Sequence, residues 1–174
     1  MVPREADSGR SGMNGVDRHH SVLPASWRDH LRAVERALGK RDLDEAQRAW
    51  ESAHLAAVES LSWEGLLAAG EACLRIGGAI GARTTAEPVA RRAYFAALYR
   101  ACRENSFDGI LRTAEAFANL GDREVVEECV GLVELQADGD QRRRRVAALI
   151  GRVGGMPMTS RIDGAAGSPP TAAA

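Results

Sequence analysis

Four histidines and three cysteines are the side chains of this 174-residue chain that could bind a metal ion or attack a substrate. His19 and His20 are adjacent in a polar segment, but two ligands fall short of the three or four that a structural zinc site needs. His30 and His54 stand in separate helical stretches, and the spacing places no nucleophile and acid beside them. The cysteines do not form a Cys-x-x-Cys pair; they are Cys73, Cys102 and Cys129. We therefore expect no catalytic residue, no metal site and no cofactor.

Two further motifs could contact phosphate. The run from Gly77 to Gly81 is glycine-rich, but no strand precedes it and no Lys-Ser or Lys-Thr follows it, so we expect a connection between helices. Arg142 to Arg145 is the one dense charge run. Successive helical residues turn by about 100°, so four arginines cannot line one groove, and we expect a solvated helix start with partners such as Asp138 and Asp140. The alternative is a small nucleic-acid-associated protein that uses this run.

Composition and charge favour a helical protein without a strong preference for anionic partners. The chain is 45% hydrophobic with 5% aromatic residues, so its core must consist mainly of Ala, Leu and Val, which suits close helix packing. Residues 25–138 carry 14 basic against 19 acidic residues, a balance of −5, and residues 139–154 carry 5 against 1, a balance of +4.

Each cysteine lies in an apolar stripe, so we expect three buried thiols in a reducing compartment, the cytoplasm. The chain has no apolar run near the ~20 residues of a membrane span, so we expect no membrane insertion.

Both ends lack apolar periodicity. Residues 1–24 and 154–174 are rich in small and polar residues, so we expect a disordered N-terminal arm and a disordered C-terminal tail. The folded domain is expected at residues 25–153.

Six segments between Ser26 and Ala137 repeat apolar residues at steps of three and four, which indicates amphipathic helices. Ser26 and Asp29 form a capping-box pattern at the first helix. Asn105 suits a left-handed helix end. Residues 79–86 read as a longer link before a helix that Thr85 could cap, and residues 140–153 read as a terminal capping helix. The cleanest stripe, 43–57, contains Trp50, whose truncation should cost about 3–5 kcal/mol.

The alternation of helical stripes and tight polar turns is typical of stacked helical hairpins. Two segments resemble the tetratricopeptide repeat (TPR): Leu38 to Ala46 followed by Trp50 and Ala53, and Ala114 and Phe117 followed by Gly121 and Asp122. Three such repeats can be placed on residues 25–137, with residues 79–86 as an insertion. The resemblance implies an all-α fold, a short right-handed α-solenoid of three antiparallel helix hairpins plus a C-terminal capping helix.

The resemblance also implies where a partner would bind. In the register of the family, three positions of each first helix point to the concave face, and here they read Leu31, Glu35 and Leu38, then Leu67, Glu71 and Leu74, then Leu111, Glu115 and Ala118. Arg75 and Arg112 should share that face. The predicted function is therefore a non-catalytic protein-protein interaction adaptor whose groove, an acidic ladder with apolar rungs, holds an amphipathic or basic segment of another protein.

Overall fold

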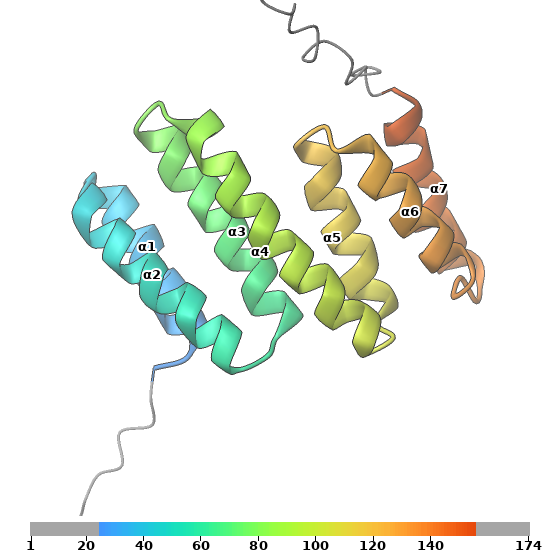
Figure 1. Ribbon diagram of the computed structural model, residues 1–174, viewed down its shortest axis with the longest axis horizontal. Helices are drawn as coiled ribbons and strands as arrows, with labels where there is room; N and C mark the ends of the chain where they lie inside the picture. Colours follow the sequence, from blue (N-terminus) through green and yellow to red (C-terminus); the bar gives the residue numbers. More distant parts are fainter. Residues whose placement is uncertain (1–24, 156–174) are drawn as a thin grey trace, which may run out of the picture.

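The computed structural model describes residues 25–155, which form seven α-helices and no strand (Figure 1). The helices are α1 (Trp27–Lys40), α2 (Leu43–Glu59), α3 (Trp63–Ala79), α4 (Arg83–Arg103), α5 (Phe107–Asn119), α6 (Arg123–Glu134) and α7 (Asp140–Gly154). This confirms the all-α class. The two expected disordered ends lie outside the described residues, apart from Gly154 and Gly155.

The packing of the helices follows a simple alternation. Each helix contacts the next one along the chain, and Figure 1 shows it running back beside its predecessor. The odd-numbered helices also contact one another in sequence, as α1 with α3, α3 with α5 and α5 with α7. In the described part of the chain the backbone of α4 approaches neither α2 nor α6 closely, although the Arg91 side chain of α4 binds Asp122, the N-cap of α6, at 2.8 Å. We call the exposed surface of α1, α3, α5 and α7 the odd-helix face, and that of α2, α4 and α6 the even-helix face.

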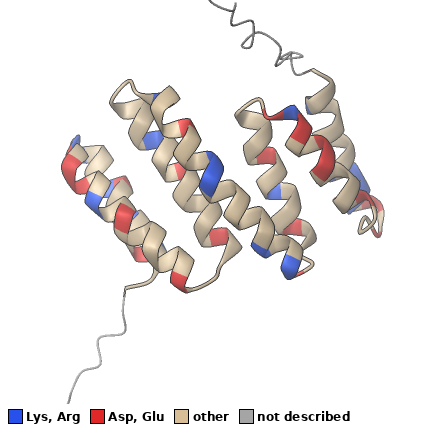
Figure 2. Cartoon of the chain, in the orientation of Figure 1, with Lys and Arg blue, Asp and Glu red and all other residues tan. Residues whose placement is uncertain are grey.

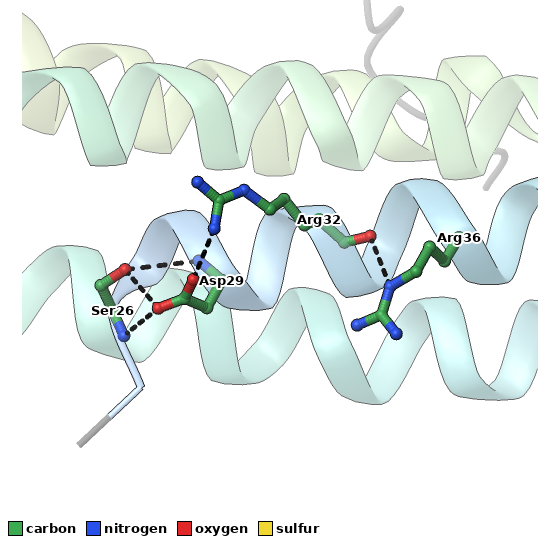
Figure 3. Close-up of polar contacts among 4 residues, drawn as sticks. All are labelled: Ser26, Asp29, Arg32 and Arg36. Atoms are coloured by element: carbon green, nitrogen blue, oxygen red, sulfur yellow. Dashed lines mark hydrogen bonds and ion pairs between the residues drawn. The ribbon is translucent and has the colours of Figure 1, made fainter. Parts of the chain in front are cut away.

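Serine side chains set the starts of three odd helices. At α1, Ser26 Oγ accepts from the Asp29 backbone N–H at 3.4 Å while Asp29 Oδ2 accepts from the Ser26 backbone N–H at 3.1 Å (Figure 3), which confirms the expected capping box. Ser62 and Ser106 cap α3 and α5 by accepting from the backbone N–H three residues later, each at 3.1 Å. Each cap satisfies a backbone donor that the first helical turn leaves unpaired.

Every turn between helices contains one residue with positive φ. Arg41, Gly81 and Gly121 precede the even helices at intervals of 40 residues, with φ of 58°, 69° and 80°. Asn105 lies in the turn after α4, and its φ of 50° places it in the left-handed region, as its residue type predicts. The unit of turn and even helix therefore recurs every 40 residues, against about 34 in the tetratricopeptide repeat.

The expected long link at residues 79–86 is wrong. α3 continues to Ala79, α4 begins at Arg83 with Ala82 as its N-cap, and Thr85 lies inside the helix. Gly77 does not end α3 because it is buried against the next helix: a Cβ there would lie 2.5 Å from the Ala86 Cβ. The reversal occurs at Gly81, whose positive φ other residues rarely adopt. The additional residues of this repeat thus lengthen helices rather than a loop.

Small side chains and a few aromatic rings fill the core, in two clusters. One lies among α1, α2 and α3, and the larger one extends from the end of α2 to α7. Tyr94 of α4 and Phe117 of α5 are its largest fully enclosed residues, 2% and 0% exposed, and their rings meet edge to face at 5.6 Å. Buried alanines, such as Ala46, Ala90 and Ala97, let the helices approach closely.

Trp50 connects α2 to α3, but it is only half-buried. Its Nε1–H donates to the Ala69 backbone carbonyl at 2.8 Å, and its ring stacks on His54 at 5.7 Å. Because part of the ring is already in water, we expect Trp50→Ala to lower the free energy of unfolding by about 2–3 kcal/mol, less than the sequence suggested. Trp50→Phe keeps an aromatic ring but removes the donor and part of the indole surface, so it should cost about 1–2 kcal/mol. Urea titration followed by circular dichroism measures both, and equal losses would assign the contribution of Trp50 to the hydrogen bond.

Candidate protein-interaction site

The leucines expected to flank the groove belong to the core. Leu67 and Leu111 are 1% and 0% exposed and lie in the larger cluster, Leu74 is also buried, and Leu31 is half-buried against the smaller cluster. The expectation of apolar rungs is wrong for Leu67 and Leu111. A partner cannot reach these two side chains, because neighbouring helices cover the side of α3 and of α5 on which they stand.

The three glutamates of the expected ladder do stand in register. Each comes nine residues after a serine N-cap, on odd helices that contact one another; they are Glu35, Glu71 and Glu115. Glu35 already has a partner on the next odd helix: Arg75 Nη2 donates to its Oε1 at 2.6 Å, with about half of each side chain exposed. This pair joins α1 to α3 and neutralises the first glutamate.

Glu71 and Glu115 differ from Glu35. Both are half-buried, and neither forms an ion pair within the described part of the chain. Burial raises the pKa of the Tyr94 hydroxyl well above its usual range, and the negative charge of Glu71 raises it further. The Glu71 carboxylate therefore lies within electrostatic reach of Tyr94. Of the three glutamates, Glu71 and Glu115 therefore remain available to bind a partner.

Arginines of the odd helices stack on a repeated aromatic residue. Trp27, Trp63 and Phe107 are the first residues of α1, α3 and α5. The Arg112 guanidinium lies 5.6 Å from the Trp63 ring, and that of Arg28 lies 4.1 Å from the Trp27 ring. Arg112 is thus held beside α3 by its stacking contact with Trp63, and its positive charge offsets part of the negative charge of the odd-helix face.

Glycines hold the aromatic residues between successive odd helices, a feature the sequence reading missed. Gly65 faces the Trp27 ring and Gly109 faces the Trp63 ring, and a Cβ at either site would lie 3.1 Å from the ring. The signal was present as a repeated motif, Ser-Trp-Glu-Gly at 62–65 and Ser-Phe-Asp-Gly at 106–109. These contacts fix the spacing of the odd helices, and therefore the spacing of the glutamates.

Most side chains of the arginine run at residues 142–145 contact other parts of the folded domain. Arg142 and Arg145 lie 4.7 and 5.7 Å from the Phe107 ring, and Arg145 also pairs with Asp108 of α5. Arg142 and Arg143 donate to the backbone carbonyls of Gln136 and Ala137. Neither Asp138 nor Asp140 forms an ion pair among the described residues, so these expected partners are wrong. Three of the four arginines thus help attach α7 to the rest of the domain.

The expectation of three buried thiols is corrected in part. Only Cys129 is buried, whereas Cys73 is half-buried and Cys102 is exposed. Burial raises the pKa of all three thiols, to about 12 for Cys129, so they resist ionisation. His54 stacks on Trp50, and its Nδ1 is buried without a hydrogen-bond partner among the described residues. Within residues 25–155, no group of three or more potential ligand side chains is arranged to hold a metal ion.

Large apolar side chains are exposed mainly on the even helices. Leu55 of α2, Phe95 and Tyr99 of α4 and Leu132 of α6 are between 42% and 61% exposed, and Leu135 directly after α6 is 88% exposed. Among the described residues, α1, α3 and α5 expose none. Leu55, Phe95 and Leu135 are 40 residues apart, so they occupy the same position of three successive units. The odd-helix face is therefore polar over α1, α3 and α5, although Ile150 of α7 is 44% exposed, and the even-helix face carries most of the exposed apolar residues.

Comparison with protein-family models, with curated proteins and with solved structures found no match. No helix in the described range is both long enough and apolar enough to cross a membrane.

Proposed function

We propose that this chain is a non-catalytic protein-interaction module, built as a right-handed α-solenoid of the tetratricopeptide type. Its three hairpins are α1 with α2, α3 with α4 and α5 with α6, and α7 is the capping helix. The contacts between successive odd helices support this architecture, because stacked hairpins bring equivalent helices together. Three free cysteines support a reducing compartment, and we place the protein in the cytoplasm.

The odd-helix face is the proposed binding site, and one observation carries this assignment: three glutamates at the same position of three helices that contact one another. Arg75 neutralises Glu35, which leaves Glu71 and Glu115 on adjacent helices. Packed helices are about 8–10 Å apart. A segment in the polyproline II conformation has three residues per turn and advances about 3.1 Å per residue, so basic residues at i and i+3 lie on one side about 9 Å apart and would match this spacing. The partner is therefore a polar segment with spaced basic side chains.

Of the two partners that the sequence suggested, an amphipathic or a basic segment, the surface of the odd helices favours the basic one. An amphipathic helix needs an exposed apolar groove, but α1, α3 and α5 expose no large apolar side chain in the described structure. A basic segment needs only accessible carboxylates, with Arg112 and Arg75 to select against the wrong register.

Replacing Glu35, Glu71 and Glu115 together by glutamine should weaken partner binding about tenfold or more at low salt, because the charge attraction is lost. The thermal midpoint should barely change, since a half-exposed ion pair such as Glu35 with Arg75 contributes less than about 1 kcal/mol. The measurement is the amount of each polypeptide retained from a cell extract by the immobilised protein.

The matched control replaces Glu59, Glu104 and Glu134 by glutamine. These glutamates are exposed at or just after the ends of even helices, and the net charge changes by the same three units. The control should retain the same polypeptides as the unmodified protein. Equal retention by both triple variants would refute the odd-helix face as the binding site.

A further inference from the structure

The outer surface of α4 carries a stripe of two aromatic residues between two arginines. Arg92, Phe95, Tyr99 and Arg103 follow at steps of three, four and four, so they share one side of the helix. Phe95 and Tyr99 are 50% and 61% exposed, and both arginines are exposed. The Arg103 guanidinium lies 6.0 Å from the Tyr99 ring, and neither arginine forms an ion pair with a described residue. The stripe is an apolar centre with an unneutralised positive charge at each end.

The outer surface of α6 carries a stripe of opposite charge. Glu124, Glu128, Leu132 and Leu135 follow at steps of four, four and three, and all four are exposed. Neither glutamate takes part in an ion pair within the described chain, whereas Glu127 beside them binds Arg123 at 2.7 Å. In Figure 2 the charged positions of α6 are mostly acidic and those of α4 mostly basic. Both stripes span 12 residues, and their 11 steps of 1.5 Å correspond to about 16 Å.

We propose that this face binds a second copy of the same chain, with α4 of each copy packed against α6 of the other. In Figure 1, α4 and α6 run in the same direction, since each lies antiparallel to α5 between them. A two-fold axis that runs parallel to α4 and α6, over this face and midway between the two helices, places α4 of one copy opposite α6 of its partner. The two facing helices then run in the same direction. The same contact then forms twice, as a two-fold interface requires.

The parallel orientation brings unlike charges and apolar residues together. Arg91 of α4 binds Asp122, the N-cap of α6, at 2.8 Å, so this part of α4 lies at the level of the start of α6. Arg92 therefore comes to the level of Glu124 and within reach of Glu128, and Tyr99 comes to the level of Leu132. Phe95 already rests on Phe117, with ring centroids 4.7 Å apart, so its exposed edge is rigidly held. Aromatic residues and arginine are the types enriched at such interfaces. The odd-helix face remains free in both copies, so the dimer would present two binding sites.

Sedimentation velocity of the full chain tests the dimer directly. We expect a concentration-dependent dimer between about 1 and 100 μM that weakens as salt is raised, because exposed charge pairs are screened. A monomer across this range at low salt would overturn the proposal and leave the face to a different partner.

Two charge-reversed proteins test the assignment of α4 against α6. Arg92→Glu places like charges opposite each other twice in its dimer, and so does the double substitution Glu124→Arg with Glu128→Arg. Each protein alone should dimerise about 100-fold more weakly or not at all. An equimolar mixture should recover the dimer, because α4 of each protein then faces α6 of opposite charge on the other. All the substituted residues are exposed, so circular dichroism should show unchanged folding.

The mixing result also separates a specific contact from general charge effects. Recovery in the mixture requires that α4 of one copy meets α6 of the other. Two reversed proteins that both remain dimers, or that stay monomeric when mixed, would overturn this geometry. Glu59→Arg, on α2 outside both stripes, is the matched control and should leave the dimer unchanged.

Discussion

Replacing Leu111 by alanine is expected to lower the free energy of unfolding by about 3–4 kcal/mol. Leu111 is fully enclosed in the larger cluster, at the centre of α5, so truncation removes buried apolar contacts and leaves a cavity. A domain of this size is stable by about 5–15 kcal/mol, so the loss should be plain in a urea titration.

Leu55→Ala is the matched control, because it removes the same atoms from a side chain that is 59% exposed. It should change stability by less than about 0.5 kcal/mol. If both substitutions cost little, Leu111 would be accessible, and the apolar groove expected from the sequence would have to be reconsidered.

This contrast shows how far the sequence could lead. The step of three and four residues identifies Leu67 and Leu111 as members of an apolar stripe, but it does not say which part of the stripe a neighbouring helix covers. The contacts of α1, α3 and α5 with one another decide that question, and they place both leucines inside. The glutamates four residues later stay accessible because they stand at the edge of the covered side.

Local signals were the most reliable part of the sequence. The capping box at Ser26 and the left-handed residue Asn105 depend on interactions within a few residues, and the structure confirms both. Ion pairs between residues far apart in the sequence could not be predicted in the same way. Arg75 with Glu35 spans 40 residues and Arg145 with Asp108 spans 37, so each depends on how the odd helices stack.

The glycines illustrate a different limit. Gly77 and Gly78 look like a helix end, because glycine disfavours helices and often ends them. In the structure both lie within α3, and the buried one is required by the close approach of α4. A single sequence does not distinguish a glycine that ends a helix from one that makes room for a neighbour.

Gly70 makes room in the same way, and replacing it by valine should cost about 3 kcal/mol. A Cβ at Gly70 would lie 2.5 Å from Cε1 and 2.8 Å from Cδ1 of Tyr94, and 3.3 Å from the Ala90 carbonyl oxygen. The Tyr94 ring has little freedom to move, since it is 2% exposed and rests edge-on against Phe117. The added atoms must therefore push α3 and α4 apart or displace the ring into α5, and either change loses packing.

The control for Gly70 lies two turns later in the same helix. Gly78→Val adds the same atoms where nothing stands within 4 Å of the new Cβ, so stability should stay within about 0.5 kcal/mol of the unmodified protein. Urea unfolding of both variants, followed at 222 nm, measures the difference. Helix propensity favours valine over glycine at both sites, so similar losses would not come from propensity or from the close contact of Gly70 with Tyr94, and that contact would be wrong. A large loss at Gly70 only would show that this contact fixes the distance between α3 and α4, and with it the position of Glu71 on the odd-helix face.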